Sequence, residues 1–286
     1  MAKKLYEESN IQAIADAIRG KNGTTYTYKV SEMASAIGEI ESGGGSGINP
    51  EWTDWRYFSY YNNRNDLVEK LKFSDTSKGT FFSNMFYYCS NLTAIPKIDT
   101  SNCTNFSNMF TMCSKLTTVP EIDTSKGTIF SNMFDNCAKL TTVPKVNTSN
   151  GTDFSYMFRG CKVLTTVPEM DTSNGTNFNY MFSGCNTLTT IPKMDTTKGT
   201  MLDNLFMDCH ALENITFTGT FKIKKNLSVF SYSNNLTVDS LMSFINALSD
   251  NSSLSTTYTV TIGSTNLAKL TEEQIAIATN KNIILA

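Results

Sequence analysis

Residues 116–139 decide the fold of this chain. They read Leu-Thr-Thr-Val-Pro-Glu-Ile-Asp-Thr-Ser-Lys-Gly-Thr-Ile-Phe-Ser-Asn-Met-Phe-Asp-Asn-Cys-Ala-Lys, and the pattern returns every 24 residues. Five of the six prolines keep this step, namely Pro96, Pro120, Pro144, Pro168 and Pro192. So do six of the seven cysteines, namely Cys89, Cys113, Cys137, Cys161, Cys185 and Cys209. Because a fixed period indicates a repeat architecture, the sequence predicts six stacked coils over residues 68–212.

Each unit combines three local patterns. Leu-Thr-Thr-Val-Pro is rich in β-branched residues and predicts a short strand that ends at the proline. Asp-Thr-Ser-x-Gly is typical of turns in which glycine supplies a positive φ. Phe130, Phe134 and Cys137 follow at spacings i, i+4 and i+7, which predict a short helix. Strand, turn and helix together predict an α/β solenoid of leucine-rich-repeat type.

Stacking is expected because a coil this short cannot bury its own apolar side without its neighbours. The cysteines then form a column with three possible roles. We favour small buried hydrophobes, because equivalent side chains in a stack point in parallel. Disulfides between coils are an alternative, and a metal site is another, although the chain has one histidine, His210. Cys103 occupies the turn-glycine position, where we expect a free thiol and consider strain.

Two further columns are polar. The first alternates in sign: Lys97, Glu121, Lys145, Glu169 and Lys193. We expect neighbouring coils to pair these opposite charges in a solvated ladder, with a ligand site as the alternative. The second contains Asp75, Asp99, Asp123, Asn147, Asp171 and Asp195. Since stacked like charges repel, we expect local backbone donors to hold each carboxylate, with calcium as the alternative.

The ends of a solenoid need caps. Residues 50–67 hold Trp52, Trp55 and further aromatics, which we interpret as an N-terminal cap, with glycan or partner contact as the alternative. Residues 213–286 predict a β-α-β-α-β cap that adds longer coils to the same sheet. Its strands are expected at 215–223, 258–262 and 282–285, and its helices at 238–248 and after a capping box at 271–274.

Residues 1–42 form a separate helical segment in this interpretation, followed by a Gly/Ser linker at 43–49. Its apolar stripe consists of Ile11, Ile14, Ile18, Met33 and Ile37. A hairpin this short rarely folds alone, so we expect it to oligomerise or to attach to another protein. Met1-Ala-Lys-Lys is followed by Glu7 and Glu8 without an apolar stretch, so we expect no secretory leader.

Composition excludes some classes of protein. The chain has 24 Lys and Arg against 26 Asp and Glu, with a net charge of −2 and no concentrated basic face, so nucleic-acid binding is not expected. No stretch approaches the length of an apolar membrane span, so membrane insertion is not expected. An enzyme is not expected either, because the acidic residues lie mainly in a regular column, there is a single histidine and no phosphate loop is present. No cofactor is implied.

The repeat unit, with its Met-Phe-x-x-Cys-x-x-Leu core, resembles the BspA-like leucine-rich repeats of bacterial surface and phage proteins. Ile11-Gln-Ala-Ile-Ala-Asp-Ala-Ile-Arg-Gly-Lys-Asn-Gly-Thr-Thr25, with Met33-Ala-Ser-Ala-Ile37, is similar to the start of many structural proteins of phages that infect Gram-positive hosts. Gly263-Ser-Thr-Asn-Leu-Ala-Lys-Leu-Thr-Glu-Glu-Gln274 is similar to the end of phage-encoded members. Secreted members carry export signals, so the resemblance favours a virion protein.

The resemblance implies a phage virion fibre or receptor-binding protein, exposed on the released particle. The N-terminus would attach to other virion proteins and form a homo-oligomer, with a trimer favoured, and the solenoid would bind a host-surface glycan or protein. The alternatives are a structural decoration or head-fibre protein and a bacterial surface adhesin.

Candidate ligand-binding residues come from the pair after Met-Phe, which varies from copy to copy. That pair includes Tyr87, Tyr88, Thr111, Met112, Asp135, Asn136, Arg159 and Met207. We expect these positions to be exposed because packing does not constrain them. Tyr87, Tyr88, Met112, Asn136 and Arg159, with Trp52 and Trp55, are the predicted ligand-binding residues, and an unconstrained surface is the alternative.

Overall fold

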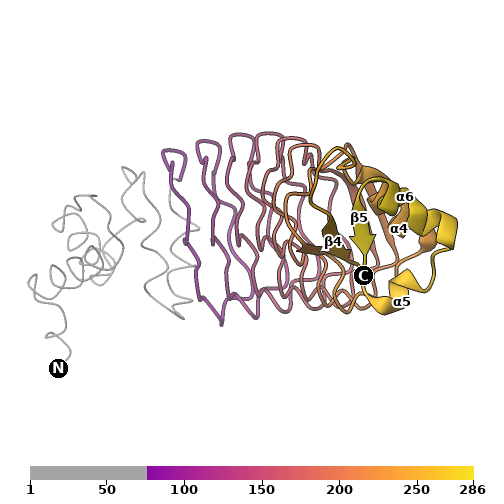
Figure 1. The fold of residues 1–286 in the computed structure, drawn as a ribbon. Helices are drawn as coiled ribbons and strands as arrows, with labels where there is room; N and C mark the ends of the chain where they lie inside the picture. Colours follow the sequence, from indigo (N-terminus) through magenta and orange to yellow (C-terminus); the bar gives the residue numbers. More distant parts are fainter. Residues whose placement is uncertain (1–75) are drawn as a thin grey trace, which may run out of the picture.

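The computed structural model describes residues 76–286, which form a repeat solenoid (Figure 1). Its coils lie side by side along one axis, and the helices gather at the C-terminal end. The predicted attachment segment, the linker and the aromatic cap lie outside the described residues. The predicted site residues in these segments, Ile11, Ile14, Ile18, Met33, Ile37, Trp52 and Trp55, lie outside them as well.

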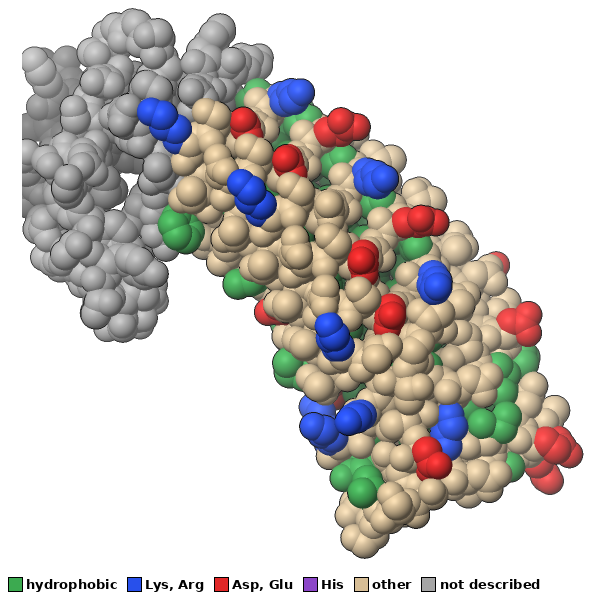
Figure 2. All heavy atoms as spheres, turned by 90° about the horizontal axis from the view of Figure 1, so that it is seen from above, with side chains coloured by type: hydrophobic (Ala, Val, Ile, Leu, Met, Phe, Trp, Pro, Cys, Tyr) green, Lys and Arg blue, Asp and Glu red, His purple; other side chains and the backbone are tan. Residues whose placement is uncertain are grey.

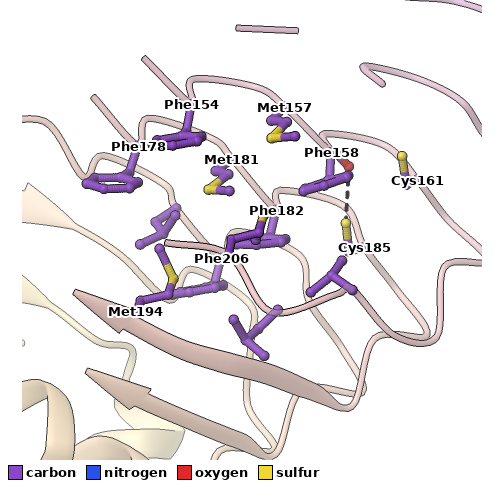
Figure 3. Close-up of a cluster of buried hydrophobic side chains, with 14 of the residues drawn as sticks. Phe154, Met157, Phe158, Cys161, Phe178, Met181, Phe182, Cys185, Met194 and Phe206 are labelled. Carbon is purple, nitrogen blue, oxygen red and sulfur yellow. Dashed lines mark hydrogen bonds between the residues drawn. The ribbon is translucent and has the colours of Figure 1, made fainter. Parts of the chain in front are cut away.

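Two columns of phenylalanine rings run through the core. Phe106, Phe130, Phe154 and Phe178 are stacked with successive ring centroids 5.6 Å apart. The second column contains Phe86, Phe110, Phe134, Phe158, Phe182, Phe206 and Phe230, with centroids 5.3–5.6 Å apart. These side chains are fully buried, and each contributes roughly 1.5–3 kcal/mol by leaving water. Like residues therefore form continuous columns, as Figure 3 shows for the labelled Phe, Met and Cys side chains.

The predicted helix in each coil is wrong. The segment is a run of consecutive turns, in which Asn132 and Asn136 both have φ of 57°. The Met133 N–H donates to the Phe130 carbonyl in its own coil (3.1 Å), whereas the Phe134 N–H donates to the Met157 carbonyl in the next coil (2.8 Å). Because a left-handed residue interrupts an α-helix, the chain exchanges helical bonds for bonds between coils. The Phe and Cys side chains still point inward.

Among the repeat segments within residues 76–212, the predicted strand is found only at the end. There, β1 (Thr190–Asp195) pairs in parallel with β2 (Asn214–Thr218). Earlier coils are joined at this position by isolated bonds, such as Thr141 N–H to the Thr117 carbonyl at 3.1 Å. Parallel bridges between coils recur instead before the first Phe of the unit, for example Ile129 with Asp153. The proline of each segment removes a donor from the ladder. The expectation that the strand ends at the proline is nevertheless wrong, because β1 continues through Pro192, and its pairing with β2 shifts register between Ile191 and Met194.

The repeat glycine was predicted for a positive φ, and this is wrong. Gly127 is not among the residues with positive φ. It is needed for space, since a Cβ there would lie 2.5 Å from Cζ of Phe130. Cys103 takes the same place one coil earlier, fully buried, with its Sγ donating to the Asn105 carbonyl at 3.2 Å.

The cysteine column consists of free, buried thiols, as favoured from the sequence, with Cys89 at the first coil only partly buried. From Cys113 onward, each Sγ of the column donates to the carbonyl of a phenylalanine one coil earlier, for example Cys185 to Phe158 at 3.1 Å (Figure 3). Ser233 continues the column in the cap, where its hydroxyl donates to the Phe206 carbonyl. Burial raises the pKa of Cys103 to about 11 and that of Cys209 to about 12, so both are protonated at neutral pH. The cysteine is therefore a small hydrophobe that also satisfies a carbonyl.

The C-terminal cap contains α4 (Val238–Ala247), β4 (Tyr258–Thr261), α5 (Ser264–Leu267), α6 (Glu272–Asn280) and β5 (Ile283–Leu285). The predicted capping box of α6, Thr271 with Gln274, is confirmed. The expectation of one continuous sheet is wrong. Only β2 extends β1, while β3 (Leu227–Ser228), β4 and β5 form a separate parallel sheet in that order. The second sheet lies on the turn side of the coils. Its strand β3 is joined to the last repeat there, because the Asn204 N–H donates to the Ser228 carbonyl.

Candidate functional site

The variable pair lies on the outward side of the turns, but its two members differ in exposure. Tyr87 and Tyr88 are 36% and 44% exposed, and their rings meet edge to face with centroids 4.7 Å apart. Thr111 and Asp135 hold the position of Tyr87 in the next two coils, and they are buried, with exposed fractions of 5% and 3%. Full exposure of the variable pair was therefore a wrong expectation. The first member of each pair packs against the neighbouring coils. A small side chain, or one in an ion pair, is therefore buried at this position.

Asp135 and Arg159, in neighbouring coils, form a bidentate ion pair. Arg159 Nε donates to Oδ1 at 2.8 Å and its Nη2 to Oδ2 at 2.7 Å. The predicted site residue Asn136 also donates to Oδ1, at 2.9 Å, whereas Met112 is half-buried and its N–H bonds to the Asp135 carbonyl. The hydrogen bonds to Asp135 raise the pKa of Arg159. A charged guanidinium is thus held rigidly at the surface, with part of its donor fork facing solvent.

Two tyrosines beside this pair were missed by the sequence analysis. The Arg159 guanidinium lies 4.6 Å from the centroid of the Tyr156 ring, and Tyr156 stacks on Tyr180 at 5.0 Å. Asparagine fills the equivalent position at Asn84, Asn108, Asn132 and Asn204. The departure from asparagine to tyrosine in two adjacent copies was the signal that could have revealed them.

These groups form one surface, here called the turn-face patch: Tyr87, Tyr88, Asp135, Tyr156, Arg159 and Tyr180. Burial, Tyr88 and the Asp135 carboxylate raise the pKa of Tyr87, which places Tyr87 within electrostatic reach of the ion pair. Beyond Arg159 the second member of the pair is glycine twice. Gly160 is buried, and a Cβ there would lie 2.5 Å from Oδ1 of Asn136, whereas a Cβ on Gly184 would meet nothing closer than the Gly160 backbone at 3.6 Å. The patch therefore offers aromatic rings, paired charges and, at Gly184, open backbone.

The aspartate column behaves as predicted. In each described coil the side chain accepts the N–H two residues on, as in Asp99 with Ser101, Asp123 with Ser125, Asn147 with Ser149, Asp171 with Ser173 and Asp195 with Thr197. Bonds from the hydroxyl and the N–H of Ser173 lower the pKa of Asp171. The column is therefore turn chemistry. Within residues 76–286, no group of three His, Cys, Asp or Glu side chains has the geometry of a metal site.

The alternating column does not form the predicted ladder of ion pairs. Lys97, Glu121, Lys145, Glu169 and Lys193, here called the charge column, are all exposed. In the described part of the chain, ion pairs join Arg159 to Asp135 and Lys225 to Asp203, and none joins two members of the charge column. Parallel side chains in a stack extend outward, and an exposed pair gains too little to hold two long side chains together.

A groove of about 730 Å³ lies between the charge column and the aspartate column. Its lining includes Lys97, Glu121 and Lys145 of the charge column and Asp99, Asp123 and Asn147 of the aspartate column. Figure 2 shows Lys or Arg side chains alternating with acidic side chains in a row along the solenoid. The groove therefore crosses three coils and carries charges of both signs.

None of the helices within residues 76–286 has the length and apolar character of a membrane span. Two overlapping segments, residues 56–165 and 128–244, match the family described as "Mycoplasma protein of unknown function, DUF285". No curated protein matches the chain significantly. The family match spans more than half of the chain and includes the turn-face patch and the charge column. The chain therefore belongs to DUF285 and is a BspA-like repeat protein.

Proposed function

We propose that this chain is a non-enzymatic binding protein of a phage virion, a fibre or receptor-binding protein that contacts the host surface through its solenoid. The observation that carries the binding role is the turn-face patch, where rings, a fixed ion pair and open backbone meet on a rigid scaffold. Contact surfaces of this composition are typical of recognition sites, in which aromatic and arginine side chains supply most of the affinity. The virion setting is supported by the resemblance of the terminal segments.

Rigidity supports the proposal. Both carboxylate oxygens of Asp135 accept hydrogen bonds from Arg159, which fixes the orientation of the guanidinium. The ring of Tyr156 lies between this guanidinium and the ring of Tyr180. A ligand would therefore meet side chains that have already lost their rotamer freedom, which lowers the entropic cost of binding. Several copies on one particle would add avidity to weak single contacts.

The test compares the full-length chain with the double variant Tyr156→Asn/Tyr180→Asn. Asparagine stands at this position in other coils with the same positive φ, so the variant keeps the backbone and removes the rings. Tyr232→Asn, at an exposed tyrosine of the cap, is the control. Binding is measured on purified cell walls of the bacterium that the phage infects, and melting temperature is recorded for each protein.

We expect the double variant to lose about tenfold or more in affinity, as for removal of interface aromatics, while the control binds like the native chain. Equal binding of all three proteins would exclude the patch as the contact site. If the chain is found by mass spectrometry in purified virions but binds no cell wall, the receptor role is wrong and a structural decoration protein is the better description.

A further inference from the structure

The charge column has no explanation in the function proposed above. Its five members are exposed, alternate in sign from coil to coil and make no ion pair with one another. Such a column cannot attract a partner of one charge, because attraction at one coil is offset by repulsion at the next. A partner must carry both signs at the spacing of the coils. A second copy of this chain has that spacing, since it is the same stack.

We infer that two copies of the chain associate side by side and antiparallel through the charge column. A twofold axis between the second and third members places Lys97 opposite Glu169 of the second copy, and Glu121 opposite Lys145 of the second copy. Symmetry repeats both contacts, which gives four ion pairs. A twofold interface is isologous, so one column suffices for both sides. Lys193 has no counterpart in this register.

The aspartate column favours the central pair. Beside Glu121 lies Asp123, so that this coil presents two carboxylates to the groove. Beside Lys145 lies Asn147 in place of aspartate, so this coil presents a lysine without an adjacent acid. The least compensated lysine of one copy thus faces a coil of the other that presents two carboxylates, Glu121 and Asp123. The groove leaves room there for a long lysine side chain.

Neighbouring registers are less favourable. Moving one copy by a single coil brings Lys145 opposite Lys145 and Glu121 opposite Glu169, so that like charges meet throughout. Opposite charges meet again after a second step, but Lys193 then becomes a member of the interface and Lys97 leaves it. The two attractive registers therefore differ in which terminal lysine they use, and this difference can be tested.

The association is expected to be weak and strongly dependent on salt, because exposed charges are screened within about 8 Å at physiological ionic strength. The test measures the mass of the full chain by sedimentation equilibrium at low and high salt. The variants are Glu121→Lys, Lys145→Glu, the double exchange of both, and Lys193→Glu as a matched control. Circular dichroism confirms that each variant is folded.

Each single exchange turns two attractions into repulsions, and we expect the dissociation constant to rise by about tenfold or more. The double exchange restores opposite charges at the central contact and should recover association. Lys193→Glu should leave it unchanged. A salt-resistant oligomer of unchanged mass in every variant, or a native chain that is monomeric at low salt, would overturn the inference. Loss of association in Lys193→Glu without rescue by the double exchange would overturn this register.

Discussion

The repeats and the C-terminal cap bury the same kinds of side chain by different means. In the repeats, adjacent phenylalanine rings are parallel, with interplanar angles of 6° or less around Phe110 and Phe134. In the cap, Phe244 meets Phe230 at 80° and Phe217 at 62°. A parallel ring presents a face that the next coil can extend, whereas Phe244 presents an edge and ends the column. The repeat geometry thus allows further coils to be stacked on the column, whereas the cap geometry ends the column.

Polar groups show the same contrast. In the repeats, a thiol or amide of one coil bonds a carbonyl of another, and the bond recurs at each step. In the cap, Lys281 Nζ donates to three carbonyls at the end of α4, those of Ile245, Asn246 and Leu248, at 3.1, 2.9 and 2.8 Å. Lys269 similarly bonds the carbonyls of Asn234 and Leu236. Unique contacts replace periodic ones where the period ends.

Alkaline pH should affect the repeats most, because all seven cysteines lie in them. Burial raises the pKa of Cys103 to about 11 and of Cys209 to about 12, from an ordinary value of 9.0. The folded values are raised, so stability is complete below pH 9.0 and is lost as pH rises toward the folded values. Between its ordinary and its raised pKa, each such thiol lowers the free energy of unfolding by about 1.4 kcal/mol per pH unit.

This loss is measured by following the circular dichroism signal and the free energy of unfolding in urea from pH 7 to pH 12. Several thiols titrating together should unfold the chain within that interval. A native signal retained at pH 12, or rapid labelling of all seven thiols at pH 8, would contradict the buried column.

Removal of one ring should be the next largest effect. Phe130 lies between Phe106 and Phe154, with 5.6 Å to each centroid, so Phe130→Ala is expected to destabilise the chain by about 3–5 kcal/mol. Phe130→Leu is the control, because Leu202 fills the same column at the end of the repeats and is buried. Urea denaturation should show a much smaller loss for leucine. Equal losses for the two variants would mean that the ring column does not determine stability.

A smaller effect is expected in the cap. Lys281→Met keeps the aliphatic stem but removes the lysine donor from three carbonyls, of which that of Ile245 still accepts the Leu248 N–H, at a cost of about 1–3 kcal/mol. Lys193→Met, at an exposed lysine of the charge column, should change stability by less than about 0.5 kcal/mol. Thermal denaturation of the two variants compares a lysine that bonds a helix end with an exposed lysine of the repeats that makes no ion pair. If both variants behaved alike, the lysine cap of α4 would have no structural role.

The columns could be predicted from the sequence, because equal residues 24 apart can share one environment only if the coils stack. The helix could not be distinguished from consecutive turns, since both bring Phe130, Phe134 and Cys137 to one side. Asn132 and Asn136 carried a usable signal, because asparagine tolerates positive φ better than most residues. Residues that accept a positive φ at two places in one unit argue against a helix there.

The candidate site was predicted only in part. Tyr87, Tyr88, Asn136 and Arg159 were identified because they vary, but variation does not reveal contacts. The ion pair between Asp135 and Arg159 depends on the coil geometry, and so does the stack of Tyr156 on Tyr180. The absence of ion pairs in the charge column has the same origin. An alternating sequence gives the order of charges, not the direction in which the side chains extend.

The coil, not the individual helix or strand, is the unit of this fold. Deletion of residues 124–147 removes one whole unit and joins Asp123 to Thr148, which restores the Asp-Thr-Ser sequence. Deletion of residues 124–143 at the same place removes a partial unit. The first variant should unfold cooperatively, and its largest dimension in small-angle scattering should shrink by about 5 Å, one strand spacing. The second should lose its fold, and a folded second variant or an unfolded first one would contradict the account.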